Sequence, residues 1–164
     1  MKKYEFTGET KRVELWNRTA TLHRIKATVE FGFVKVGELG GWIEKEENLS
    51  HEGKAWVCGN AEVCGDAKVW GNAKVCGDAK VCGDAEVFLA SHVLVMGSVG
   101  SRNDFTTFFR DKDNEITVKC GCFLGKIDKF LEKVTQTHGN NKYALVYRAA
   151  VEVAKLQIEL TERK

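Results

Sequence analysis

A six-residue unit repeats through the middle of the chain, and this repeat limits the possible folds more than any other feature. From Ala55 to Arg102 the units read AWVCGN, AEVCGD, AKVWGN, AKVCGD, AKVCGD, AEVFLA, SHVLVM and GSVGSR. A unit this short cannot bury its own apolar residues, but stacked units share a continuous core. We therefore predict a parallel β-solenoid from about residue 55 to 102.

The residue types within one unit predict a short strand followed by a corner. Ala stands first, a polar residue second and Val third, so Ala and Val face one side of the strand and the polar residue faces the other. Gly followed by Asn or Asp ends most units, and these residues tolerate the left-handed backbone that a corner needs. Ala and Val are the expected core.

This pattern resembles the hexapeptide repeat of left-handed β-helix proteins, in which three units complete one coil. The resemblance implies the left hand and the three-sided coil, neither of which follows from the period alone. Residues eighteen apart would then be neighbours on adjacent strands. The expected neighbours on the outer face are Glu62 and Lys80, Lys68 and Glu86, Cys58 and Cys76, Cys64 and Cys82, and Trp70 and Phe88.

The fourth position of the units forms an outer row of Cys, Trp and Phe that is too apolar to face water. We expect a cover for it. A homotrimer is the leading form by resemblance to the fold, and a dimer through the C-terminal helices is the alternative. If the protein is a monomer, helices of the same chain would cover the row.

The cysteines are predicted to be free thiols that fill a packed groove, because four of them occupy one repeat position in a chain expected in a reducing compartment. Stacked thiols could also form a bridge or hold a metal. Cys120 and Cys122 form a CxC motif without a second pair, which favours structural thiols. The four histidines match no metal set, so we predict no metal site and no cofactor.

The regions around the repeats predict a cap at one end and a mixed region at the other. Alternating apolar residues from Leu22 to Ile43 indicate strands, 104–120 indicates a hairpin with its turn at 111–114, and two helices follow on either side of His138-Gly139. The predicted fold class is mainly β. It comprises an N-terminal β cap (1–42), a hexapeptide β-helix (43–102) and a C-terminal hairpin with two helices (103–164).

Several segments together resemble small β-helix proteins encoded by phages and prophages. They are GELGGWIE before the repeats and GSRNDFTTFF, VKCGCFLG and THG after them. The resemblance implies a phage setting and a host cytoplasmic location, but no chemistry. By analogy with phage proteins of this size, it suggests that the protein counters host defence by binding a nucleotide signal.

Composition excludes some classes of partner. The chain has 25 Lys and Arg against 23 Asp and Glu, so no strongly basic surface for nucleic acid is expected. No segment approaches the roughly 20 apolar residues of a membrane helix, and no leader follows the N-terminal lysines, which predicts a cytosolic protein.

An acyltransferase would need a histidine base, since that is the activity for which the hexapeptide fold is best known. His92 alone lies within the clear repeats, at an outward position where a surface role is expected. No catalytic residues are predicted, and this enzyme class is the last of three alternatives.

Residues 100–110 combine glycine, hydroxyls, arginines and aromatic rings, as a site for a phosphate or carboxylate requires. Arg102, Thr106 and Arg110 are an even number of residues apart and should share a strand face. Lys119 is expected to join them from the partner strand. Our leading hypothesis is a non-enzymatic protein that oligomerises and binds a small anionic ligand there; a structural or protein-binding module is the second.

Overall fold

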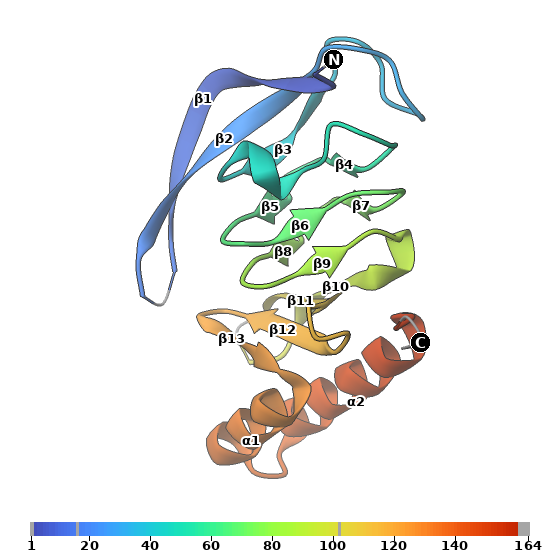
Figure 1. Cartoon of the computed structure of the whole chain (residues 1–164). Helices are drawn as coiled ribbons and strands as arrows, with labels where there is room; N and C mark the ends of the chain where they lie inside the picture. The colour runs from blue at the N-terminus through green and yellow to red at the C-terminus, as the bar shows by residue number, and fades with distance from the viewer. Residues whose placement is uncertain (1, 16, 102, 161–164) are drawn as a thin grey trace.

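The computed structural model describes residues 2–15, 17–101 and 103–160. Three regions follow one another along the molecule: an N-terminal β-hairpin, a stack of repeat turns, and a C-terminal sheet covered by two helices (Figure 1). The hairpin does not only cap the stack, because its two long strands also extend down one side of it.

The N-terminal hairpin is joined to the repeats through a single strand. β1 (Tyr4–Glu14) and β2 (Thr19–Ala27) pair antiparallel, and β3 (Leu39–Ile43) pairs antiparallel with β2. The other edge of β3 pairs parallel with β5 (Glu62–Val63). The first large sheet is therefore mixed, with the order β1-β2-β3-β5-β8.

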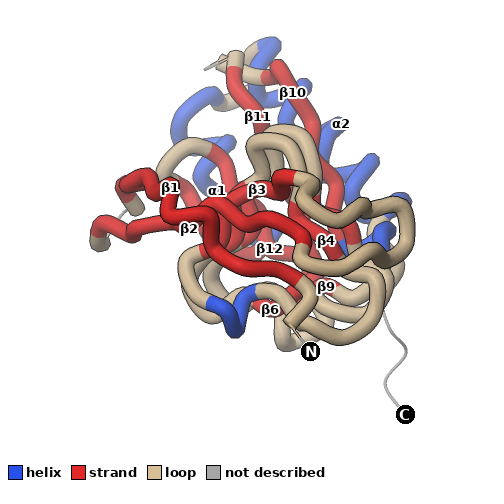
Figure 2. The backbone as a smooth tube through the Cα atoms, turned by 90° about the horizontal axis from the view of Figure 1, so that it is seen from above, coloured by secondary structure: helices blue, strands red, loops and turns tan. Residues whose placement is uncertain are grey.

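The repeats stack with the predicted eighteen-residue register. The strands are β4 (Trp56–Val57), β5 (Glu62–Val63), β6 (Lys68–Val69), β7 (Lys74–Val75), β8 (Lys80–Val81) and β9 (Glu86–Val87). They pair parallel as β4 with β7, β5 with β8, and β6 with β9, which aligns Glu62 with Lys80 and Lys68 with Glu86. The view along the stack shows the corners of successive turns lying over one another (Figure 2).

Alanine and valine of the repeats form the core, as predicted. Every Ala at the first position and every Val at the third, from Ala55 to Val87, is at most 1% exposed. Because each strand contributes only one or two inward side chains, the core exists only when the turns are stacked.

The predicted fold class, a mainly β chain built around a parallel β-helix of hexapeptide repeats, is nevertheless wrong. Its sheets are short and separate: a five-stranded mixed sheet, a four-stranded antiparallel sheet and two parallel pairs, with two helices. The glycine corners limit each repeat strand to two residues, whereas the strands of seven or more residues pair antiparallel. The last two predicted units, 91–102, do not continue the stack, because β10 (Val93–Val99) pairs antiparallel with β11 (Asp104–Arg110).

The C-terminal sheet has the order β10-β11-β12-β13, completed by β12 (Ile116–Cys120) and β13 (Phe123–Lys126). Its second strand divides two cores. Phe109 packs into the repeat core, whereas Phe108 packs against the helices, and both are fully buried. Thr107 also faces the repeats, where its Oγ1 accepts the backbone N–H of Lys80 at 2.9 Å.

The two predicted helices are present as α1 (Ile127–His138) and α2 (Lys142–Gln157). Gly139 ends the first with a positive φ of 59°, and the Asn141 side chain caps the second by accepting the N–H of Ala144 at 3.1 Å. Neither helix, nor any other in the described part of the chain, has the length and apolarity to cross a membrane.

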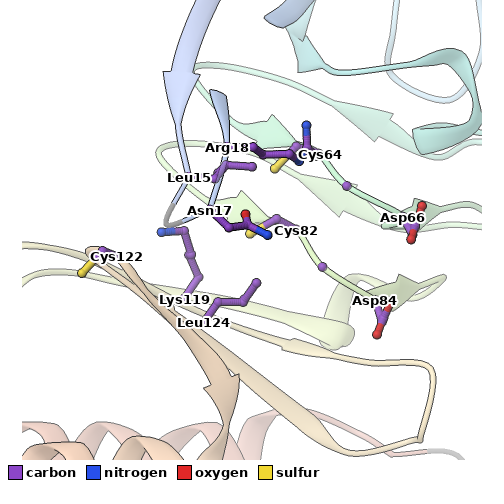
Figure 3. A pocket seen from close by; sticks show the side chains of 12 residues that line it. Leu15, Asn17, Arg18, Cys64, Asp66, Cys82, Asp84, Lys119, Cys122 and Leu124 are labelled. Carbon is purple, nitrogen blue, oxygen red and sulfur yellow. The ribbon is translucent and has the colours of Figure 1, made fainter. Parts of the chain in front are cut away.

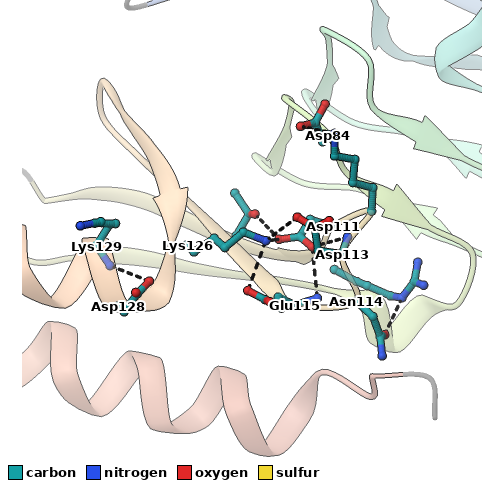
Figure 4. Close-up of polar contacts among 11 residues, drawn as sticks. Asp84, Asp111, Asp113, Asn114, Glu115, Lys126, Asp128 and Lys129 are labelled. Carbon is teal, nitrogen blue, oxygen red and sulfur yellow. Dashed lines mark hydrogen bonds and ion pairs between the residues drawn. The ribbon is translucent and has the colours of Figure 1, made fainter. Parts of the chain in front are cut away.

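The turn between β11 and β12 is held by a buried carboxylate (Figure 4). Asp111 is 3% exposed, and its Oδ1 accepts the N–H groups of Asp113 and Glu115 at 2.9 and 3.1 Å. Its Oδ2 accepts the Thr117 hydroxyl at 2.7 Å and the Lys126 ammonium at 3.1 Å. The sequence predicted the position of this turn, and the structure places Asp111 at the centre of its hydrogen bonds.

The chain itself covers the apolar outer row only in part: Cys64 and Cys82 are buried, whereas Cys58, Trp70, Cys76 and Phe88 are half-buried. Trp70 stacks on Phe88 with ring centroids 5.0 Å apart, as predicted, and the Arg110 guanidinium lies over the Phe88 ring at 5.0 Å. His92 packs edge-on against the same ring. Cys64 and Cys82 are buried with residues of the N-terminal hairpin and Leu124 of β13. Contacts within the chain therefore account for part of the cover that the row was expected to need.

Candidate functional site

The predicted ligand residues do not form one cluster among the described residues. Arg102 lies outside the described residues. Thr106 is 1% exposed, and its hydroxyl lies 3.5 Å from the Cys120 sulfur. Arg110 reaches toward the repeats, where its Nη1 donates to the Glu86 carbonyl at 2.8 Å and its Nε to Asn114 at 3.1 Å. Arg110 thus links two parts of the fold.

Lys119 lies in a different place, in a cavity of about 250 Å³ between three regions of the fold. Figure 3 shows this cavity between the tip of the N-terminal hairpin, two repeat turns and the C-terminal sheet. The residues that line it are Leu15, Asn17, Arg18, Cys64, Gly65, Asp66, Cys82, Gly83, Asp84, Lys119, Cys122 and Leu124.

Arg18 is neutralised where it lines the cavity. Its two terminal nitrogens donate to both carboxylate oxygens of Glu44, at 2.6 and 2.9 Å. Glu44 also accepts the N–H of Gly65 at 2.8 Å. The Arg18 hydrogen bond, more than any other cause, holds the pKa of Glu44 below its usual range. This bidentate pair fixes one wall of the cavity.

The two aspartates at the rim are also paired with lysines. Asp66 lies 3.2 Å from the Lys45 ammonium, and Asp84 lies 3.5 Å from that of Lys112. Both carboxylates point away from the cysteines (Figure 3), and their side chains are 80% and 53% exposed. They contribute little negative potential to the interior because solvent screens them.

Lys119 gives the cavity its positive charge. Its ammonium donates to the Gly121 carbonyl, and no carboxylate of the described residues forms an ion pair with it. Arg18, Asp66 and Asp84 are each paired with an opposite charge. The charge of Lys119 is therefore the uncompensated one among the residues that line this cavity of about 250 Å³. A cavity of this kind attracts an anion.

Two thiols form the floor beside Lys119. Cys64 and Cys82 are 4% and 3% exposed, and both are free. A hydrogen bond between them, together with burial, raises the pKa of Cys64 well above its usual range. The same bond lowers the pKa of Cys82, although burial opposes the shift and the charge of Lys119 assists it. Of the two thiols, Cys82 is therefore the better nucleophile.

The equivalent cysteines one strand earlier are not free, contrary to the prediction. Cys58 and Cys76 form a disulfide with their Cα atoms 4.6 Å apart, within the range that such a bond requires. The eighteen-residue stack places their Cβ atoms on neighbouring strands, so the bridge that the sequence left as an alternative is formed.

His92 is not a surface residue as predicted, but is fully buried. Its Nδ1 accepts the backbone N–H groups of Phe88 and Leu89 at 3.1 and 3.2 Å. Burial first, and then the charge of Arg110, lowers the pKa of His92. An imidazole held neutral in this way is a structural acceptor, which argues against its use as an acyltransferase base.

His92 predicts a pH dependence of stability. Because the pKa of His92 is lower in the folded than in the unfolded chain, the unfolded state binds more protons once the pH falls toward the usual histidine pKa of about 6.5. Stability should fall as the pH drops through this value. We expect a smaller fall in melting temperature between neutral and mildly acidic pH for His92→Gln than for the wild type. Equal slopes in scanning calorimetry would contradict this assignment.

Among the described residues no group of three or more His, Cys, Asp or Glu side chains is placed to hold a metal ion. Cys120 packs against the helix core, whereas Cys122 lines the cavity beside Lys119. Both also line a smaller hollow next to α1 and α2.

No family model matches the chain, and no curated protein matches it. The site geometry alone therefore supports the functional assignment. Sequence reasoning included Lys119 but missed the cavity, because its walls come from positions near residues 17, 65, 83 and 120. The stacked cysteines were the one available signal.

Proposed function

We propose that the protein is a non-enzymatic binding protein whose cavity holds a small anionic ligand, with Lys119 as the anchor. The observation that carries the proposal is the Lys119 ammonium, which forms no ion pair with a described carboxylate, whereas the other charged side chains of the cavity are each paired. The backbone of Gly65 and Gly83 lines the same cavity as Lys119.

The size of the cavity favours a compact anionic group. About 250 Å³ lies slightly below the roughly 300–1,000 Å³ of typical small-molecule pockets. A phosphate or carboxylate would fit inside, whereas a nucleotide would place only its phosphate there. We further propose that the protein acts in a phage setting, in the host cytoplasm, and that the ligand it sequesters there is a nucleotide signal.

Lys119→Met should weaken binding at least tenfold, which corresponds to about 1.4 kcal/mol. The change removes the charge but keeps most of the apolar stem, so the sheet should remain intact. Calorimetry with inorganic pyrophosphate, ADP-ribose and a cyclic dinucleotide would measure the effect. Lys129→Met is the matched control, because that ammonium pairs with Glu132 on the outer side of α1. The proposal fails if no probe binds the wild type, or if Lys119→Met binds as tightly.

A second proposal, self-association, is supported by a different surface. Leu145, Val153 and Leu156 of α2 are 61%, 45% and 88% exposed, and Leu160 beyond the helix is 43% exposed. On a helix the first three lie within one face. Lys142 near the start of α2 and Glu159 beyond its end would meet opposite charges in an antiparallel dimer, so we propose a dimer through this helix over a trimer.

The double variant Leu145→Glu/Leu156→Glu should convert that dimer to a monomer, because it buries two charges in the interface. Light scattering at micromolar concentrations is the measurement. A wild-type protein that is already monomeric, or a double variant that stays dimeric, would contradict the α2 interface.

A further inference from the structure

Cys64 and Cys82 are related to each other in the stack in the same way as the bridged cysteines Cys58 and Cys76. In both cases the fourth-position residues of stacked turns follow a pair of aligned valines, Val57 with Val75 and Val63 with Val81. In both, the backbone N–H of the upper cysteine donates to the carbonyl of the lower valine, at 2.8 Å for Cys58 and 3.0 Å for Cys64.

The glycine corners after the two pairs also stack alike. A Cβ placed on Gly59 would lie 3.1 Å from the nitrogen of Gly77, and one placed on Gly65 would lie 3.1 Å from that of Gly83. The backbone on both sides of Cys64 and Cys82 thus matches the backbone that closes a disulfide one strand earlier. Both side chains are buried and both line the same cavity.

We propose that Cys64 and Cys82 are a reactive dithiol that closes to a second disulfide by exchange with a small-molecule disulfide entering the cavity. Both cysteines line the cavity beside Lys119, so the reagent has a route to them. Its negatively charged groups would be attracted by the same ammonium. The proposal goes beyond anion binding and does not depend on it.

The chemistry balances without a metal or a cofactor. The Cys82 thiolate attacks one sulfur of the reagent, forms a mixed disulfide and releases the first reagent thiolate, which takes up a proton. The Cys64 thiol then loses its proton and attacks the sulfur of Cys82, which releases the second reagent thiolate. Two protein thiols are oxidised to one disulfide, and one reagent disulfide is reduced to two thiols.

The order of attack follows from the environment of the two sulfurs. The neighbouring Cys64 thiol and the charge of Lys119 lower the pKa of Cys82, and all three side chains line the same cavity. The neighbouring Cys82 and burial raise the pKa of Cys64, so we assign Cys64 as the resolving thiol. With this assignment, Cys64→Ser and Cys82→Ser should give different products.

The test treats the full chain, with Cys120→Ser and Cys122→Ser, with oxidised glutathione under native conditions. Both Cys64 and Cys82 remain, so the result does not depend on a change in the buried pair. Peptide mapping by mass spectrometry without reduction should find a Cys64–Cys82 cross-link, and thiol counting should fall by two per chain. A lasting glutathione adduct, or a cross-link that forms only in urea, would overturn the proposal.

Two further variants test the roles of the sulfurs. Cys64→Ser should stop at a glutathione adduct on Cys82, and Cys82→Ser should leave Cys64 reacting at least tenfold more slowly. Equal rates would overturn the assignment of the attacking thiol. Binding of pyrophosphate to the untreated protein is measured separately, so failure of the anion proposal and failure of the dithiol proposal give different results.

Discussion

Asn48→Asp is expected to lower the free energy of unfolding by about 4 kcal/mol, since it places a charge where a buried amide makes four hydrogen bonds. Asn48 is fully buried. Its Oδ1 accepts the N–H groups of Glu44 and Lys45 at 3.1 and 2.8 Å. Its Nδ2 donates to the carbonyls of Gly65 and Ala67 at 3.1 and 2.9 Å.

The effect should be larger than that of a lost hydrogen bond. An aspartate would turn a second oxygen toward two carbonyl oxygens, and burial opposes its ionisation. Asn60→Asp is the matched control, because Asn60 is exposed at a corner where other repeats have Asp. Urea unfolding followed by circular dichroism would measure both. A loss below about 1 kcal/mol for Asn48→Asp would show that its four bonds do not hold the segment.

The same change should disturb the cavity. Asn48 holds the backbone of Glu44, and the Glu44 carboxylate holds both Arg18 and the Gly65 amide. A variant that stays folded should therefore loosen the ion pair between Arg18 and Glu44. This link between the short 3₁₀ helix Glu46–Asn48 and the cavity wall was not visible in the sequence.

Asp111→Ala is the second change with a large expected effect, a loss of about 3 kcal/mol of unfolding free energy. It removes the acceptor for two backbone N–H groups and the Thr117 hydroxyl, and it takes a carboxylate from Lys126. Burial tends to lower the pKa of Lys126, but its bonds to Asp113, Asp111 and Glu115 outweigh this and raise it.

Asp113→Ala provides the comparison for Asp111→Ala. Its carboxylate also contacts Lys126, at 2.9 Å, but its side chain is 51% exposed. Solvent screening should keep its contribution within about 1 kcal/mol. Thermal and urea unfolding of both variants would separate the two carboxylates. Equal losses would mean that the charge on Lys126, and not the buried turn network, is what matters.

The sequence was sufficient for features with a local or periodic origin. The repeat gave the Ala and Val core and the pairing of residues eighteen apart, and the apolar spacing with Gly139 and Asn141 gave two helices. The sequence was insufficient where a strand pairs with a segment that is not fixed by the repeat. Val93–Val99 keeps the alternation of a repeat but pairs antiparallel, because β11 offers a longer ladder than another two-residue turn.

The site was harder to predict for the same reason. Lys119 could be suggested from its charge, but its neighbours depend on how the hairpin tip and β13 approach the repeats. Arg110 resembled a ligand residue because the sequence cannot show that Phe88 and the Glu86 carbonyl lie beneath it. The two cysteine pairs are identical in the repeat pattern, yet one is bridged and the other lines a cavity.

The central claim is that an anion binds in the cavity beside Lys119, and NMR with isotope-labelled protein tests it most directly. During titration with inorganic pyrophosphate, we expect the largest amide shifts at Gly65, Gly83, Lys119 and Leu124, with much smaller shifts in the same protein carrying Lys119→Met. The largest shifts at Arg110 and Asn114 with none at Gly83, or no shifts at all, would contradict the claim.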